Sequence, residues 1–449
     1  MPEPARTTLS VRQERAVLVG VLLPGSTADP RDPLGELASL ARTAGAKVVA
    51  MITQKRRRID PGKYVGTGKA REIAELAARH DADVVIFDND LTPGQIGALE
   101  QIINEESSRP PERPLKVLDR SELILDIFAT RARTYEARLQ VELAQLQYTY
   151  PRLARMWSHL ERIAGGGAAF GGIGTRGPGE TQLETDRRLV RNRIADLKSE
   201  IARIEARKAR TVAERNRRHF TACIVGYTNA GKSTLFNTLT GAGVYADDKL
   251  FATLDTRTRA WKLERGMEIM LSDTVGFVRD LPHHLVASFR ATLEEAVHAD
   301  LLLHVLDVGH PHSHQQFRSV HEVLESIGAR GKPEILLLNK IDTPAGRDAL
   351  PEWRALYPQA IAISARSGRG LDRLVHVVSE TARGREHELT IEVDVTDGRL
   401  ISLIESRTRV QHRCFVNGLA RFELIAGEQV LRELLNHKGV TVIQPPSTE

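Results

Sequence analysis

The segment Gly226–Ser233 reads GYTNAGKS and fills every fixed position of the pattern Gly-x-x-x-x-Gly-Lys-Ser/Thr. An apolar run, Thr221–Gly226, precedes it, and the sequence TLFNTLTG after it has helical character. In this context the backbone N–H groups of the loop turn toward phosphate oxygens at a helix N-terminus. We expect Lys232 to reach the β- and γ-phosphates of a nucleotide and Ser233 to bind Mg²⁺. The predicted phosphate-binding residues are Gly226, Tyr227, Thr228, Asn229, Ala230, Gly231, Lys232, Ser233 and Thr234.

Three later motifs predict which nucleotide binds. The run Met267–Phe277 contains Asp-Thr-Val-Gly, in which Asp273 would hold the Mg²⁺ hydration shell and the Gly276 amide would sense the γ-phosphate, with Thr274 and Val275 between them. Asn339, Lys340 and Asp342 form the spacing Asn-Lys-x-Asp. A carboxylate accepts from two adjacent donors on guanine that adenine lacks, so Asp342 is the expected specificity residue. We expect Asn339 to brace the loop and the base, Lys340 to cover the base plane, and the Ser364–Ala365 turn to direct the Ala365 amide at the guanine oxygen.

The catalytic residues are predicted to be Lys232, Thr253 and Gly276. The segment Phe251, Ala252, Thr253, Leu254 is expected to contact the nucleotide, with Thr253 as a third Mg²⁺ ligand beside Ser233 and Asp273; Thr256 and Thr258 are alternatives. Phe277 occupies the position where many GTPases have a water-orienting Gln, so we expect slow hydrolysis by the chain alone. Asn229 is a candidate K⁺ ligand, and ordinary loop hydrogen bonding is the other interpretation of this residue.

The elements that position these residues follow from hydrophobic patterning. Apolar runs at 16–23, 48–53 and 83–88 alternate with helical stretches, which predicts buried strands of a parallel sheet. After Ser121, apolar residues recur in steps of four and three at Leu139, Leu143, Leu146, Tyr150, Leu153, Trp157 and Leu160, and again at Val190, Ile194, Leu197, Ile201 and Ile204. We expect an antiparallel helical hairpin interrupted near Pro151, although two helices packed flat on their neighbours would give the same pattern.

A glycine-rich segment, residues 164–180, joins the two arms and should resist helix or strand. It would act as a flexible linker or become ordered on a partner. The second arm is strongly basic: twelve Lys and Arg and four acids lie between Arg187 and Arg218, a local charge of +8 against +5 for the whole chain. A solvated helix face is the usual reason for a charge run, but an imbalance of this size fits a phosphate backbone better.

The glycine-rich GGGAAFGGIGTRGPGETQLETDRR followed by GYTNAGKST, FATLD, DTVGF and NKID resembles the HflX GTPases of the Obg–HflX group. The segments Lys63–Ile73 and Arg131–Tyr148 are similar to that family as well, and the resemblance covers about residues 15–385. The sequence departs from the usual FATLDPT, because Thr256 follows Asp255. The resemblance implies an N-terminal α/β domain with a helical hairpin, a Ras-like G domain, binding to the large ribosomal subunit and, in some members, splitting of stalled ribosomes.

We therefore expect an α/β multidomain protein with an N-terminal α/β domain (1–120), a long antiparallel helical hairpin with the glycine-rich linker (121–218), a Ras-like P-loop GTPase domain (219–385) and a small C-terminal α+β domain (386–449). It should be a monomeric GTPase that binds GTP and GDP, is stimulated by ribosomes, contacts rRNA and the large ribosomal subunit, and acts on stalled or idle ribosomes. A GTP-gated RNA-binding factor in ribosome assembly or RNA modification is the alternative. A scaffold that does not hydrolyse GTP also stays open because of Phe277.

Composition and weaker motifs exclude other classes. Two cysteines, Cys223 and Cys414, cannot form a disulfide framework, and no run approaches the about 18 apolar residues of a membrane span. A cytoplasmic location is expected, with peripheral membrane association left open. Gly66–Lys69 carries half of a phosphate motif, for which a turn into a helix is favoured over an ATP site. His310, His312 and His314 are interpreted as a surface loop rather than a metal site.

Overall fold

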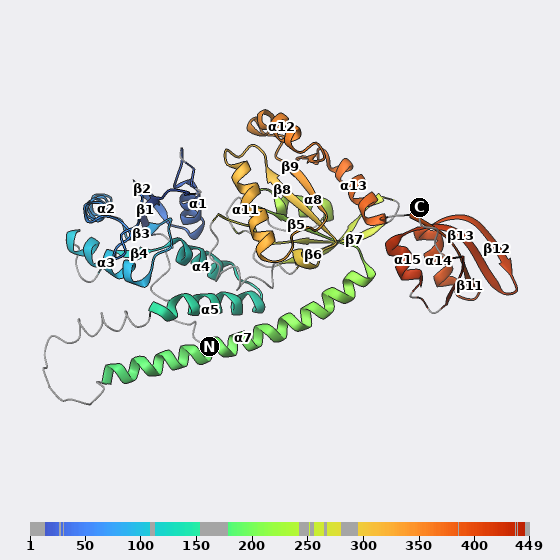
Figure 1. Cartoon of the computed structure of the whole chain (residues 1–449), viewed down its shortest axis with the longest axis horizontal. Helices are drawn as coiled ribbons and strands as arrows, with labels where there is room; N and C mark the ends of the chain where they lie inside the picture. The colour runs from blue at the N-terminus through green and yellow to red at the C-terminus, as the bar shows by residue number, and fades with distance from the viewer. Residues whose placement is uncertain are drawn as a thin grey trace. The chain divides into compact units, whose positions relative to one another are not determined.

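The computed structural model describes residues 14–26, 28–29, 31–107, 113–152, 178–241, 251, 256–264, 267–279, 295–384, 386–435, 437 and 439–444. The chain forms two compact units (Figure 1). The first comprises residues 1–207, 247–255 and 276–292, and the second comprises residues 208–246, 256–275 and 293–449. Among the described residues, no helix combines the length and the apolar character needed to cross a membrane.

The first unit is built on a four-stranded parallel sheet in the order β2-β1-β3-β4. Its strands are β1 (Arg15–Leu22), β2 (Lys47–Lys55), β3 (Val84–Phe87) and β4 (Lys116–Leu118). Strands β1 and β3 are buried, as the apolar runs predict. The prediction of a buried strand at 48–53 is wrong, because β2 is an edge strand and alternates exposed with partly buried residues.

Among the described residues, four helices pack with this sheet. They are α1 (Gly35–Ala44), α2 (Thr67–Arg79), α3 (Pro93–Glu106) and α4 (Arg120–Arg131). Thr92 and Gln95 form a capping box at the start of α3, and Gly45 ends α1 in the left-handed conformation. Helix α2 begins at Thr67, which confirms that Gly66–Lys69 is a turn into a helix.

The predicted helical hairpin is present in the described residues. Helix α5 (Tyr135–Thr149) ends in a 3₁₀ turn, η1 (Tyr150–Arg152), where Pro151 interrupts the pattern, and α7 (Pro178–Arg218) is the second arm. Leu139 and Leu143 pack against Leu197 and Ile201. Ion pairing of Arg193 with Glu142 and the hydrogen bond from Tyr135 to Glu200 show that the helices run antiparallel.

Part of the linker prediction is wrong. Residues 178–180 are helical and open α7, because proline is well tolerated in the first turn, where no N–H partner is lost. The rest of the glycine-rich segment, 164–177, lies outside the described residues, as do Leu153, Trp157 and Leu160 of the first heptad stripe.

The second unit contains a six-stranded sheet in the order β10-β9-β8-β5-β7-β6, in which only the pairing of β6 with β7 is antiparallel. The strands are β5 (Thr221–Gly226), β6 (Arg257–Lys262), β7 (Glu268–Asp273), β8 (Leu301–Asp307), β9 (Glu334–Asn339) and β10 (Ile361–Ala362). The helices are α8 (Lys232–Thr240), α11 (Ser313–Ser326), α12 (Pro344–Leu356) and α13 (Leu371–Arg383). Parallel strands place the carboxyl ends of β5, β8 and β9 at one edge of the sheet, where ligands bind in such folds.

A smaller antiparallel sheet follows in the order β12-β13-β11-β14. It comprises β11 (Glu386–Asp394), β12 (Arg409–Val416), β13 (Leu419–Gly427) and β14 (Val440–Gln444), with α14 (Gly398–Arg407) and α15 (Glu428–Leu435). Phe422, Leu424 and Ile404 lie in its core. The predicted α/β fold class, with its small C-terminal α+β part, is confirmed.

Candidate functional site

The phosphate-binding loop connects the end of β5 to the start of α8. Gly226 has φ of 149° and Gly231 has φ of 101°, a region that L side chains rarely adopt. A Cβ at Gly226 would overlap the carbonyl oxygen of Val305, and one at Gly231 would overlap the side-chain amide of Asn339. These two positions therefore require glycine both for conformation and for space.

Lys232 is the first residue of α8 and is buried. Its Nζ donates to the carbonyl oxygens of Gly226 at 3.0 Å and Tyr227 at 2.7 Å, so the ammonium group lies inside the loop. Burial lowers the pKa of Lys232 to about 8, and the attraction of Asp273 only partly opposes this shift. A bound polyphosphate would supply the negative charge that this buried cation lacks.

Ser233 and Asp273 meet across the edge of the sheet. The Ser233 hydroxyl donates to Asp273 Oδ2 at 2.9 Å, and Asp273 is almost fully buried at the end of β7. Hydroxyl and carboxylate oxygens are the ligands that Mg²⁺ prefers, so this donor set fits the ion that P-loop GTPases use. The neighbouring Thr274 donates its hydroxyl hydrogen to the carbonyl oxygen of Ile224 at 2.7 Å, which ties the Asp-Thr-Val-Gly segment to β5.

Asn339 joins the two halves of the predicted base site. Its Nδ2 donates to the carbonyl oxygen of Ala230 at 2.7 Å, and its Oδ1 accepts from the backbone N–H of Ala365 at 2.9 Å. The structure therefore brings the loop, β9 and the Ser364–Ala365 turn together. The amide of Ala365 donates to Asn339 here, and its expected role toward the guanine oxygen stays a prediction.

Lys340 and Asp342 extend beyond β9. Lys340 has a left-handed backbone with φ of 64° and pairs with Asp307 Oδ2 at 2.8 Å. Asp342 is exposed, so its carboxylate is accessible to a ligand. The pairing of Asp307 with Lys340 was not predicted from the sequence, because a single aspartate at a strand end forms no motif. Only its position at the end of β8, next to β9, could have indicated it.

The remaining residues predicted to form the nucleotide site either belong to the first unit or lie outside the described residues. Phe251 is buried, and its ring lies edge-on to Phe128 of α4 with the centroids 4.6 Å apart. Ala252, Thr253 and Leu254 lie outside the described residues, so the role of Thr253 as the switch threonine stays a prediction. Phe277, directly after Gly276, is also buried and 2% exposed.

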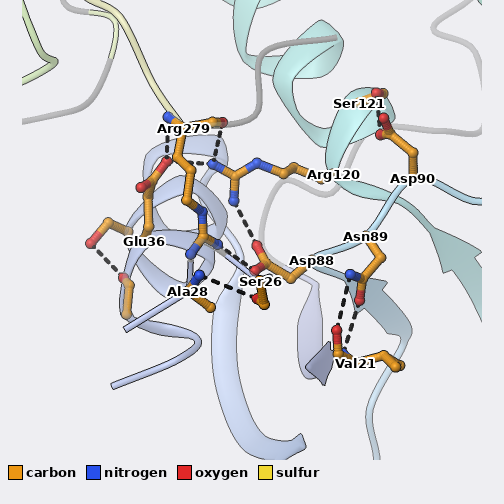
Figure 2. Close-up of polar contacts among 12 residues, drawn as sticks. Val21, Ser26, Ala28, Glu36, Asp88, Asn89, Asp90, Arg120, Ser121 and Arg279 are labelled. Carbon is orange, nitrogen blue, oxygen red and sulfur yellow. Dashed lines mark hydrogen bonds and ion pairs between the residues drawn. The ribbon is translucent and has the colours of Figure 1, made fainter. Parts of the chain in front are cut away.

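Arg279, which sequence reasoning missed, lies in a buried cluster of charges (Figure 2). Its Nη2 contacts Asp88 Oδ2 at 2.5 Å, and its backbone N–H donates to Glu36 Oε1 at 3.3 Å. Arg120 contacts Asp88 Oδ1 at 2.6 Å, donates to the carbonyl oxygen of Arg279 at 3.0 Å and pairs with Glu36. Burial raises the pKa of Asp88 against the opposing effect of both arginines. The cluster therefore holds both the backbone and the side chain of Arg279, which lies three residues after Gly276.

Comparison with known proteins assigns these features to a family. Family models match three consecutive parts of the chain: GTP-binding GTPase N-terminal over residues 31–129, GTP-binding GTPase Middle Region over 131–217, and 50S ribosome-binding GTPase over 221–340. A crystal structure of a GTP-binding protein from the hyperthermophilic archaeon Sulfolobus solfataricus, in complex with GDP, is 25% identical, covers 82% of this chain and 99% of that chain, and has a TM-score of 0.41.

Two bacterial proteins match over most of their length. GTPase HflX of Escherichia coli (strain K12) is 44% identical over 392 residues, which is 87% of this chain and 88% of that protein. GTPase HflX of Lacrimispora saccharolytica is 41% identical over 421 residues, or 92% of this chain and 95% of that protein. With such identity over nearly the whole length, and with a P-loop, an Asp-x-x-Gly segment and an Asn-Lys-x-Asp motif at one sheet edge, the chain belongs to the HflX family of GTPases.

Proposed function

We propose that this GTPase binds the large ribosomal subunit and uses GTP binding and hydrolysis to act on stalled or idle ribosomes. The observation that carries the proposal is the exposed basic surface of α7, on which Arg188, Lys198 and Arg203 lie apart from the apolar seam of Leu197 and Ile201. A row of exposed cations on a long helix suits the phosphate backbone of rRNA. The helix leads directly into β5 and the phosphate-binding loop.

The roles of the site residues are part of the same proposal. Asp342 reads the guanine base, and its exposure supports this role. Ser233, Asp273 and Thr253 hold Mg²⁺, which neutralises phosphate charge when it is bound. Asn229 is exposed with φ of 60°, a position from which its amide oxygen could serve a K⁺ ion beside the phosphates.

Hydrolysis by the chain alone is proposed to be slow. Phe277 has no polar atom to orient water and is buried, so a partner or another group must complete the catalytic site. The ribosome is the proposed source of that group or of the movement that supplies it. We also propose that the chain works as a cytoplasmic monomer divided at about residues 120, 218 and 385.

The deciding experiment measures GTP hydrolysis by the full-length chain with no ribosomes, with small subunits and with large subunits. We expect large subunits alone to raise the rate in a saturable manner, and 70S ribosomes incubated with chain and GTP to separate into subunits on sucrose gradients. Stimulation without separation would favour the alternative role in ribosome assembly. No stimulation at any concentration of large subunits would refute the proposal.

A further inference from the structure

A second cluster of metal-ligating side chains lies in the GTPase sheet, apart from the phosphate-binding loop. His304 comes from β8, His321 from α11, and Glu334 is the first residue of β9, whereas Asn339 of the nucleotide site is the last. The ligand atoms of the three residues all lie within 4.8 Å of one another, and no other such group of three occurs among the described residues. Among the described residues, His310, His312 and His314 form no such group of three metal-ligating side chains. His314 does not lie in a loop, as the sequence predicted, but is the second residue of α11.

The contacts of the neutral His321 ring place an acceptor nitrogen opposite an acceptor oxygen of Glu334. The Nδ1 atom of His321 lies 3.0 Å from the backbone carbonyl oxygen of Phe317, which can only accept, so Nδ1 must carry a hydrogen. In a neutral imidazole the other nitrogen, Nε2, then presents a lone pair. That lone pair faces Glu334 Oε2 at 3.2 Å. Only a proton on Nε2 or a cation between the two atoms makes this contact attractive.

His304 contacts the other oxygen of the carboxylate, where an N–H on its Nδ1 can donate an ordinary hydrogen bond. His304 Nδ1 lies 2.8 Å from Glu334 Oε1, and His304 is fully buried, with its Nε2 lacking a hydrogen-bond partner. Burial lowers the pKa of His304, which favours the neutral imidazole that metals bind. Burial also disfavours ionisation of Glu334, but the two imidazoles beside it lower its pKa to about 2, so the carboxylate is charged.

We propose that His304, His321 and Glu334 form a binding site for a divalent transition-metal ion of the zinc class. Two imidazoles and one carboxylate are a known zinc ligand set that leaves a fourth position for water. Imidazole donors select such ions over Mg²⁺ and Ca²⁺, so the site is chemically distinct from that of the nucleotide-bound ion. The side chain of His321 is 42% exposed, which gives the ion a route from solvent. The distances of 2.8 Å from His304 Nδ1 to Glu334 Oε1 and 3.2 Å from His321 Nε2 to Glu334 Oε2 are close to the separation of about 3.3 Å between neighbouring ligands of a tetrahedral zinc ion.

The test uses the full-length chain, stripped of metal with a chelator, and titrated with Zn²⁺ against a chromogenic competitor. We expect one tight site per chain, and visible absorption bands typical of four-coordinate cobalt when Co²⁺ replaces Zn²⁺. His321→Gln and Glu334→Gln should each weaken zinc binding by about 10- to 100-fold or more and abolish the cobalt bands. GDP binding by each variant shows that the G domain is folded.

The matched control is His314→Gln, which removes an exposed histidine from the same helix, where it pairs with Glu352 at 2.9 Å. This variant should bind zinc as the parent chain does. Wild-type zinc affinity in both His321→Gln and Glu334→Gln, or no stoichiometric binding by the parent chain, would overturn the proposal. In either case the contact between His321 and Glu334 would be an ion pair held by a proton. If Glu334→Gln fails to bind GDP, the exposed His321→Gln variant decides.

Discussion

Asp342 is exposed just beyond β9, three residues after the asparagine that ties the loop to the base site. Because its carboxylate would accept from both donors of guanine, Asp342→Asn should lower GTP affinity by about 100-fold or more. The same change should raise affinity for xanthosine triphosphate, whose 2-oxo group accepts from an amide. Equilibrium binding of fluorescent nucleotides measures both effects. Asp348→Asn, a change of the same kind at an exposed acid on α12, is the control and should leave both affinities unchanged. An unaltered GTP preference in Asp342→Asn would show that Asp342 does not read the guanine base.

Lys232 makes nucleotide binding depend on pH. Its pKa in the free protein is about 8, and a bound triphosphate favours the cation, so binding requires uptake of a proton once the pH exceeds that value. GTP affinity should therefore be level below pH 8 and fall by up to about tenfold per pH unit above it. Lys232→Arg keeps the charge at every accessible pH and should remove the dependence even if it binds more weakly. A parent chain with level affinity from about pH 7 to about pH 9 would contradict a lowered pKa.

At the scale of elements, the Arg279 cluster connects the segment after Gly276 to β3, α1 and α4 within the first unit (Figure 2). Two guanidinium groups share the nearly buried carboxylate of Asp88. Asp88→Asn would remove the charge that both buried guanidinium groups share, although Arg120 keeps its pair with Glu36. Breaking buried pairs of this kind costs about 3–5 kcal/mol. We expect faster hydrogen–deuterium exchange in peptides from β1 and β3 and in the segment 276–279, measured by mass spectrometry.

Asp81→Asn is the matched control for that experiment. Asp81 belongs to the same unit and lies 4.0 Å from Arg113, but its side chain is 67% exposed. Exposed pairs contribute at most about 1 kcal/mol, and asparagine tolerates the left-handed backbone of residue 81, where φ is 46°. Equal exchange in Asp81→Asn and Asp88→Asn would mean that the cluster does not hold residue 279.

What the sequence predicts depends on how far apart the interacting residues lie along the chain. The nucleotide motifs are short runs whose order implies one sheet edge, and the structure places Ser233 and Asp273 2.9 Å apart; their roles toward a ligand stay predictions. The Arg279 cluster joins residues up to 243 positions apart, and its single arginines and carboxylates have no periodicity to detect. The edge position of β2 was missed for a related reason, since an apolar run does not reveal which strands will flank it.

For the binding of RNA by the whole molecule, the distribution of charge along the chain matters more than the net charge. The chain carries +5, but residues 187–218 alone carry +8, so the remainder is acidic. Leu197 and Ile201 direct one side of α7 toward α5, which leaves exposed cations on the rest of its surface. An acidic remainder repels RNA, so binding to rRNA should depend on this one helix and should weaken steeply with salt.

Neutralising three exposed cations of α7, as Arg188→Gln, Lys198→Gln and Arg203→Gln together, tests this dependence. Cosedimentation with large ribosomal subunits at several KCl concentrations should show weaker binding and a log–log salt slope reduced by about 2–3, because each phosphate contact contributes about 0.9. The control changes the exposed Arg347, Arg354 and Arg373 of α12 and α13 to Gln, which removes the same charge elsewhere. If both triple variants lose affinity and slope equally, net charge rather than α7 governs binding. If neither does, the basic surface of α7 is only a solvated helix face. A loss confined to the α7 variant, with GDP affinity unchanged, would place the rRNA contact on the helix that leads into the phosphate-binding loop.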